Sequence, residues 1–111
     1  MKLPSQGNRG YRDMGNSLKS ATFLMESRLA EAARGDADAL YDLGMAYSTG
    51  SGGIDIDMIE AHKWFNLAAL GGSEEAMMCR ADISDDMTAR EIAEAQRQAR
   101  AWLQATDRRA A

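Results

Sequence analysis

Ala39-Leu-Tyr-Asp-Leu-Gly-Met-Ala-Tyr47 and Glu60-Ala-His-Lys-Trp-Phe-Asn-Leu-Ala-Ala69 are the two stretches that decide the fold of this 111-residue chain. In each stretch the apolar residues recur at spacings of three and four, which places them on one face of a helix. The recurring positions are Leu40, Leu43, Gly44 and Tyr47 in the first stretch and Ala61, Trp64, Phe65 and Ala68 in the second. The pattern therefore predicts two amphipathic helices, each with one buried face.

Residues that begin and end helices flank both stretches. Asp36 can cap the first helix, which we expect to end in the glycine-rich turn over residues 48–53. Asp57 and Glu60 have the spacing of a capping box at the start of the second helix, and two glycines at 71–72 end it. These signals predict a helical hairpin between residues 36 and 72.

The same reasoning predicts helices on both sides of the hairpin. Residues 17–34 carry their apolar positions on one stripe and are followed by a glycine. Ser73 can cap a short helix that ends near residue 83. Thr88 and Glu91 repeat the capping-box spacing at the start of a long last helix. We therefore expect about five helices.

The composition agrees with an all-α fold in a single domain. Val is absent and Pro occurs once, so residues that favour helix outnumber those that favour strand. A chain of this length buries only a modest core, which makes two folding units improbable. We expect one domain over residues 16–106, with a flexible tail at 1–15 and a short tail at 107–111.

An internal repeat links the hairpin to the residues beside it. Ala32, Gly35 and Ala39 recur as Ala69, Gly72 and Ala76, an offset of 37 residues. Periods of this length are typical of stacked helical hairpins, in which each hairpin covers its apolar face against a neighbour.

Over roughly residues 32–76 the chain resembles the Sel-one-like repeat family, a relative of the tetratricopeptide repeat. The resemblance implies a right-handed α/α solenoid of antiparallel helical hairpins that binds other proteins. The matching signature positions are Leu40, Leu43, Gly44, Tyr47, Gly50, Gly52, Asp57, Ala61, Trp64, Ala68, Ala69 and Gly72. Small residues among them allow close helix approach, and the aromatic ones supply apolar area at about 25 cal/mol for each Å² buried.

The chain departs from the family pattern in two places. The turn around residues 52–53 is one residue longer than usual, which a surface loop tolerates. At the 37-residue offset, Leu40, Leu43 and Tyr47 become Met77, Arg80 and Ser84. We interpret the chain as one full repeat at 36–72, a capping helix at 17–34 before it and a degenerate repeat at 73–105 after it.

Charge is distributed unevenly along the chain. Residues 1–20 contain four basic and one acidic side chain, whereas residues 36–86 contain eleven acidic and two basic ones. An acidic body repels nucleic-acid phosphates, so we expect no DNA or RNA partner and favour a basic one. The alternative is that these charges only solubilise helix ends and exposed faces.

The sequence favours a reducing, cytoplasmic setting. The single cysteine cannot form an intramolecular disulfide, and the first residues lack the apolar run of a secretory signal. The longest apolar stretch in the body of the chain is far shorter than the roughly 20 residues that span a membrane. We expect no membrane role.

Candidate catalytic residues are few, and we expect no enzyme activity, cofactor or metal. His62 lies one residue off the Trp64 stripe and is interpreted as an exposed surface histidine rather than a base or metal ligand. Cys79 is interpreted as an ordinary half-buried thiol. Asp55 and Asp57 lack the other ligands of a calcium loop. Some secreted, cysteine-rich members of the family are linked to β-lactam chemistry, but this chain lacks their regularly spaced cysteines.

The resemblance also implies a binding surface, because the first helix of each tetratricopeptide-like hairpin lines the concave groove. The corresponding residues are Asp38, Tyr41, Met45 and Ser48 of one hairpin and Glu75, Met78 and Asp82 of the next. Two methionines and a tyrosine among acids suit a basic amphipathic helix or an extended peptide. The alternative is a module whose concave face is empty and which binds through its ends. Of the other methionines, Met25, Met58, Met77 and Met87 are expected to fill the core.

Three functions remain open on the sequence. The first is an adaptor or scaffold that binds a protein or peptide through the concave face or an open end. The second is a structural protein that associates with itself as a homodimer, since stacked repeats leave apolar ends. The third, from another class, is a small hydrolase or ligand-binding protein.

Overall fold

A computed structural model describes residues 20 and 22–110, and for 108–110 the backbone alone. The first helix covers residues 22–33. It is followed by α2 (Ala37–Thr49), the short 3-10 turn η1 (Ser51–Gly53), α3 (Met58–Leu70), α4 (Glu74–Ser84) and α5 (Ala89–Ala110). No strand occurs among the described residues, so the all-α prediction is confirmed there.

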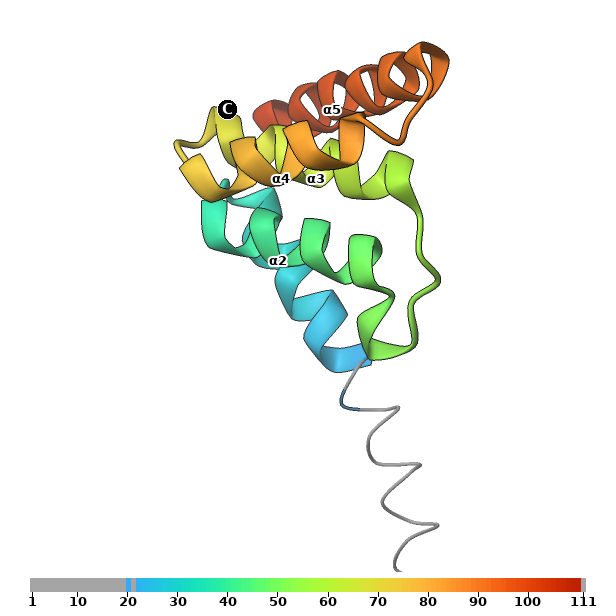
Figure 1. Ribbon diagram of the computed structural model, residues 1–111. Coiled ribbons are helices and arrows are strands. Elements are labelled where there is room, and N and C mark those ends of the chain that lie inside the picture. Colours follow the sequence, from blue (N-terminus) through green and yellow to red (C-terminus); the bar gives the residue numbers. More distant parts are fainter. Residues whose placement is uncertain (1–19, 21, 111) are drawn as a thin grey trace, which may run out of the picture.

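The helix α3 is the centre of the molecule. It packs against α2, α4 and α5. In Figure 1, α2 and the helix over residues 22–33 occupy the lower part of the molecule, and α3, α4 and α5 the upper part. One apolar core joins these helices, and its buried members are Ala32, Ala39, Leu40, Leu43, Ala61, Trp64, Phe65, Leu67, Ala68, Ala76 and Ala99. The faces predicted to be buried on α2 and α3 are therefore buried.

Two contacts of α3 show how small and large residues share the core. Gly44 of α2 lies directly against the Phe65 ring, so the two helices approach closely at this point. On another side, the Trp64 ring meets Trp102 of α5 edge to face, with centroids 4.7 Å apart. Such an arrangement is favourable beyond the area it buries. The last helix is thus anchored on α3.

The 37-residue offset is visible as two equivalent corners. At the first corner the amide of Gly35 donates to the carbonyl of Ala32, and at the second the amide of Gly72 donates to Ala69. Both glycines have positive φ, 88° and 101°, a conformation that other residues rarely adopt. The repeat in the sequence thus corresponds to a repeat in local structure.

The predicted helix starts are occupied by the expected caps. Side chains of Asp36, Asp57 and Ser73 accept hydrogen bonds from the first free amides of α2, α3 and α4. Thr88 and Glu91 form a complete capping box, with bonds of 2.8 and 3.1 Å in the two directions. The box predicted for Asp57 and Glu60 is only half formed.

Glu60 points along its helix instead of back to the cap. Its carboxylate accepts from Lys63 Nζ at 3.0 Å and from the indole nitrogen of Trp64 at 2.9 Å. A buried indole N–H needs an acceptor, and Glu60 is the group that supplies it. The capping box at Asp57 and Glu60 is therefore incomplete because the Glu60 carboxylate binds the indole of the buried Trp64.

The chain ends differ from the predicted boundaries. The tail predicted at 1–15, and residues 17–19 of the first predicted helix, lie outside the described residues. At the other end α5 continues to Ala110, so the prediction of a tail from residue 107 is wrong for 107–110. No helix among the described residues has the length and apolar character to cross a membrane.

Candidate functional site

The seven residues predicted to form a binding surface fall into two groups. Asp38, Glu75, Met78 and Asp82 are exposed, whereas Tyr41, Met45 and Ser48 are half-buried. The exposed ones lie at the start of α2 and along one face of α4. The half-buried ones contact other parts of the protein: Tyr41 and Met45 pack against the core, and Ser48 forms a hydrogen bond within α2.

Met45 and Ser48 contribute little free surface. Met45 packs against the core cluster. The Ser48 hydroxyl donates to the Met45 carbonyl at 3.1 Å, within its own helix. Replacing either residue would therefore test the packing of α2 more than the binding of a partner.

Three of the predicted residues do come together. Asp38, Tyr41 and Glu75 line a cleft of about 390 Å³ between the starts of α2 and α4. Its remaining lining residues are Ala37, Gly71, Gly72, Ser73 and Glu74. The cleft is open and acidic, which suits a cationic group rather than an anion.

Tyr41 is the aromatic residue that lines this cleft. Its ring lies 5.8 Å from that of Phe65, tilted by 52°. Burial raises the pKa of the Tyr41 phenol, and the neighbouring Cys79 and the carboxylates of Glu75 and Asp42 raise it further. The hydroxyl therefore stays protonated at neutral pH and can donate a hydrogen bond.

The outward face of α4 is more apolar than the sequence indicated. Met78 is 69% exposed, and Met77, predicted to fill the core, is 44% exposed. That prediction is wrong because α4 and α5 each pack mainly on α3, so Met77 is not covered by a tightly packed hairpin partner. Met25, Met58 and Met87 are half-buried.

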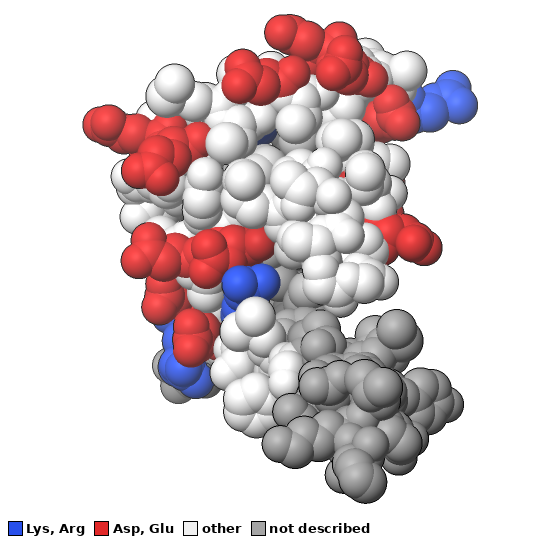
Figure 2. Space-filling model, turned by 60° about the horizontal axis from the view of Figure 1, so that its bottom comes forward, with Lys and Arg blue, Asp and Glu red and all other residues white. Residues whose placement is uncertain are grey.

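The carboxylates around these methionines form no ion pair within 4 Å among the described residues. Ion pairs within 4 Å link Arg28 to Asp42, Lys63 to Glu60 and Arg97 to Glu94. Among the described residues, none involves the acids of α4 and the turn after it, which are Glu74, Glu75, Asp82, Asp85 and Asp86. Figure 2 shows acidic side chains distributed over the viewed face around uncharged surface, with few basic ones.

His62 contradicts the sequence-based interpretation. Instead of lying on the surface it is 2% exposed, and its Nδ1 has no hydrogen-bond partner among the described residues. The prediction failed because α3 is covered on several sides, so a residue beside the Trp64 stripe is also enclosed. Burial lowers the pKa of His62, and the Arg80 guanidinium lowers it further.

Arg80 lies at the contact between α4 and α3. Its Nη1 donates to the Asn66 side-chain oxygen, one turn along α3 from His62. At the 37-residue offset Arg80 replaces Leu43, which is fully buried in α2. The degenerate repeat therefore has a polar contact where the full repeat has an apolar one. The sequence shows the replacement of leucine by arginine, but it does not show that Asn66 is the partner of the arginine.

The other candidate catalytic and metal-ligating residues do not form a cluster. Cys79 is a half-buried free thiol, as predicted, and its neighbour is Tyr41. Asp57 caps α3, and Asp55 is exposed. In the part of the chain that the structure describes, no three His, Cys, Asp or Glu side chains are grouped to hold a metal ion.

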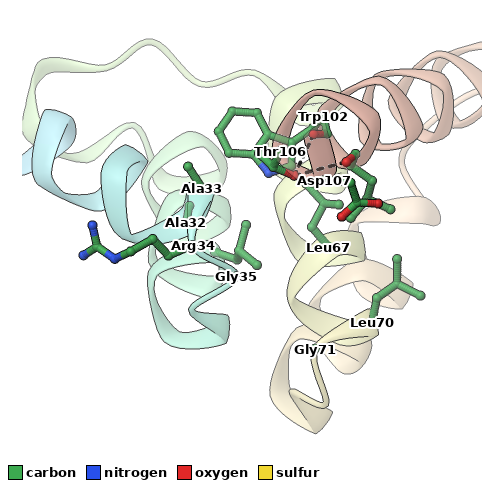
Figure 3. A pocket seen from close by; sticks show the side chains of 12 residues that line it. Ala32, Ala33, Arg34, Gly35, Leu67, Leu70, Gly71, Trp102, Thr106 and Asp107 are labelled. Carbon is green, nitrogen blue, oxygen red and sulfur yellow. Dashed lines mark hydrogen bonds between the residues drawn. The ribbon is translucent and has the colours of Figure 1, made fainter. Parts of the chain in front are cut away.

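A second hollow, missed by the sequence, lies where the helix over residues 22–33 ends beside α3 and α5. It has a volume of about 280 Å³, and Leu40, Leu67, Leu70, Trp102 and Leu103 give it an apolar lining. Figure 3 shows its edges, with Ala32 and Ala33 facing Leu67 and Trp102 across the hollow and the Arg34 side chain turned away. Without convergent polar groups, this hollow is suited to contact rather than chemistry.

Comparison of the chain with models of protein families, with curated proteins and with solved structures gives no match in any of the three. The resemblance to the Sel-one-like repeat family therefore stays a prediction from the residues.

Proposed function

We propose that this protein is a protein-interaction module, an adaptor or scaffold of the Sel-one-like repeat type, rather than an enzyme. The observation that carries the proposal is the outward face of α4, where Met77 and Met78 are exposed between carboxylates that form no ion pair with any described residue. Exposed apolar side chains rimmed by polar ones mark interaction surfaces. The cleft at Tyr41 extends this surface toward α2.

The repeat architecture supports the proposal. The equivalent corners at Gly35 and Gly72, 37 residues apart, are compatible with a solenoid of helical hairpins. The outward face of α5 is exposed and mostly polar, as in a helix that caps a stack. The proposal places the module in the cytoplasm, where a lone thiol such as Cys79 stays reduced.

We expect Met78→Lys to abolish partner capture, because the lysine removes the thioether from the apolar contact and its ammonium, one turn from Glu74 and Asp82, offsets the charge of these carboxylates. The tagged full chain and the variant are used to capture proteins from a cell lysate, which are quantified by mass spectrometry. The matched control is Ile56→Lys, since Ile56 is 60% exposed and belongs to the loop before α3 rather than to α4. Equal loss in both variants, or unchanged capture by Met78→Lys, would move the site off α4.

Self-association is a second candidate function, and the hollow in Figure 3 favours it. Leu70 and Leu103 both line the hollow, and they are 67% and 37% exposed. If this surface pairs two copies, light scattering after size-exclusion chromatography will show a dimer for the wild type and a monomer for Leu70→Lys. A wild type that is monomeric at high concentration removes this candidate.

A further inference from the structure

We propose that the occupant of the α4 face is a basic amphipathic helix of another protein, with an apolar stripe on Met77 and Met78 and Lys or Arg side chains against the surrounding acids. The inference rests on the proposed function and adds the chemistry of the partner. Three features of α4 support it: its exposed methionines, the carboxylates beside them and the carboxylates at its end.

The first observation is an apolar stripe of helical spacing. Met77, Met78 and Ala81 are all exposed on α4; the two methionines are consecutive, and Ala81 lies one turn beyond them. Ala76 is fully buried beneath them, so the helix is held from below while this stripe remains open. Thioether side chains are flexible and polarizable, which suits contact with the apolar face of a docked helix.

The second observation is uncompensated negative charge on both sides of that stripe. Glu74 and Glu75 precede the methionines, and Asp82 follows one turn after Met78. The basic residue of α4, Arg80, is bound to Asn66 and does not neutralise them. A segment with positive charge flanking an apolar stripe complements this pattern, whereas an acidic or neutral segment does not.

The third observation is that the charge opposes the stability of α4 itself. Asp82, Asp85 and Asp86 lie at the end of the helix, where the macrodipole is negative, and the last turn contains no basic residue. Carboxylates at this end are unfavourable, because their charge has the same sign as the helix terminus. Among the described residues no cation pairs with these carboxylates, and a broken local rule of this kind is expected at a binding site, where a cationic partner supplies the compensation.

The length of α4 defines the size of the occupant. Eleven residues at 1.5 Å per residue give about 16 Å of helix, which matches a partner helix of about three turns. So short a contact provides less than the roughly 1,000 Å² of a stable complex, so we expect weak, salt-sensitive binding unless the partner also enters the Tyr41 cleft.

The test uses three synthetic 14-residue helical peptides and fluorescence anisotropy with the full chain. One peptide carries a leucine stripe flanked by lysines, the second has glutamines in place of the leucines, and the third has glutamates in place of the lysines. We expect the first to bind at low salt and to weaken about tenfold at 0.3 M salt, because surface charges are screened. The other two are expected to bind at least tenfold more weakly.

Two variants locate the site. Asp82→Asn/Asp85→Asn/Asp86→Asn removes the charge and Met77→Gln/Met78→Gln removes the stripe, and each is expected to weaken the first peptide about tenfold. The matched control, Glu26→Gln/Asp55→Asn/Asp107→Asn, removes three exposed carboxylates elsewhere and should leave binding unchanged.

The outcomes separate this inference from the proposed function. Equal weakening by the control variant, or equal binding of the leucine and glutamine peptides, overturns the inference, because it shows non-specific attraction to an acidic protein. If the lysine–leucine peptide fails to bind while Met78→Lys still abolishes partner capture, the partner is not a basic helix but the proposed function stands.

Discussion

Gly44→Ala is expected to lower the free energy of unfolding by about 1–3 kcal/mol, the usual cost of overpacking a well-filled core. In an ordinary helix the same change is stabilising by about 0.5–1 kcal/mol, because alanine loses less conformational entropy than glycine. Here a Cβ on Gly44 would lie 2.5 Å from two carbons of the Phe65 ring. Phe65 is 1% exposed and enclosed by the core, so the ring cannot move away without displacing its neighbours. The clash therefore outweighs the gain in helix propensity.

Urea denaturation followed by circular dichroism measures this change, and a second substitution tests its cause. Phe65→Leu alone destabilises by leaving a cavity, but in the Gly44→Ala background the smaller side chain makes room for the new methyl group. The double variant should therefore lose less stability than the sum of the two single variants. A Gly44→Ala protein that is more stable than the wild type contradicts the close approach of α2 and α3.

Local signals explain why the helices could be predicted from the sequence. Asp36, Ser73 and Thr88 act within four residues of themselves, and each caps the helix expected of it. The apolar spacing of Leu40 and Leu43 likewise identifies the buried face of α2 without knowledge of its partner. The glycines at the two corners were recognisable because their positive φ is a local requirement.

Features that depend on which helices meet could not be predicted. Glu60 was assigned to the cap of α3 because of its spacing, but the buried indole of Trp64 claims its carboxylate. Met77 was assigned to the core because it occupies the position of Leu40 in the repeat, but it is exposed because α4 and α5 both pack mainly on α3. Periodicity describes one helix at a time and does not show how much of its circumference is covered.

The candidate binding surface, likewise, could be predicted only in part. Asp38 and Tyr41 were predicted from the resemblance to tetratricopeptide-like hairpins, and Glu75 as the equivalent of Asp38 at the 37-residue offset; the structure brings all three to one cleft. Met45 and Ser48 were placed on the surface by the same resemblance, but one packs on the core and the other bonds to its own helix. The offset gives the register of the two helices, whereas the exposure of each side chain depends on the neighbouring helices.

His62 is expected to make the protein lose stability as the pH falls below about 6.5, the ordinary pKa of histidine. Burial first, and then the positive charge of Arg80, hold the pKa of His62 in the folded protein below that value. The unfolded chain therefore takes up a proton at a higher pH than the folded one. The stability is fully present above pH 6.5 and declines below it, by up to about 1.4 kcal/mol per pH unit, until the folded-state pKa is reached.

Chemical denaturation at a series of pH values between 7.5 and 5.5 measures this decline, because most carboxylates titrate below that window. His62→Gln keeps a polar side chain at the site but does not titrate, so its stability should change little over the same range. Arg80→Met removes the repulsion and leaves the burial, so it should reduce the decline without abolishing it. A His62→Gln protein with the same pH dependence as the wild type would assign the decline to other groups.

The loss is expected to begin at α4, because protonated His62 and Arg80 would place two cations at the contact between α3 and α4. Ala76 is fully buried in α4, while Cys79, Arg80 and Ile83 are only partly covered, so this helix has little apolar burial to oppose the repulsion. Amide hydrogen exchange at pH 5.5 should accelerate in residues 74–84 before it does in α2, after correction for the intrinsic effect of pH. If α2 and α4 lose protection together in the wild type, His62 acts on global unfolding alone. If α4 loses protection first, acidification weakens the helix that bears the proposed docking face while the α2–α3 hairpin remains folded.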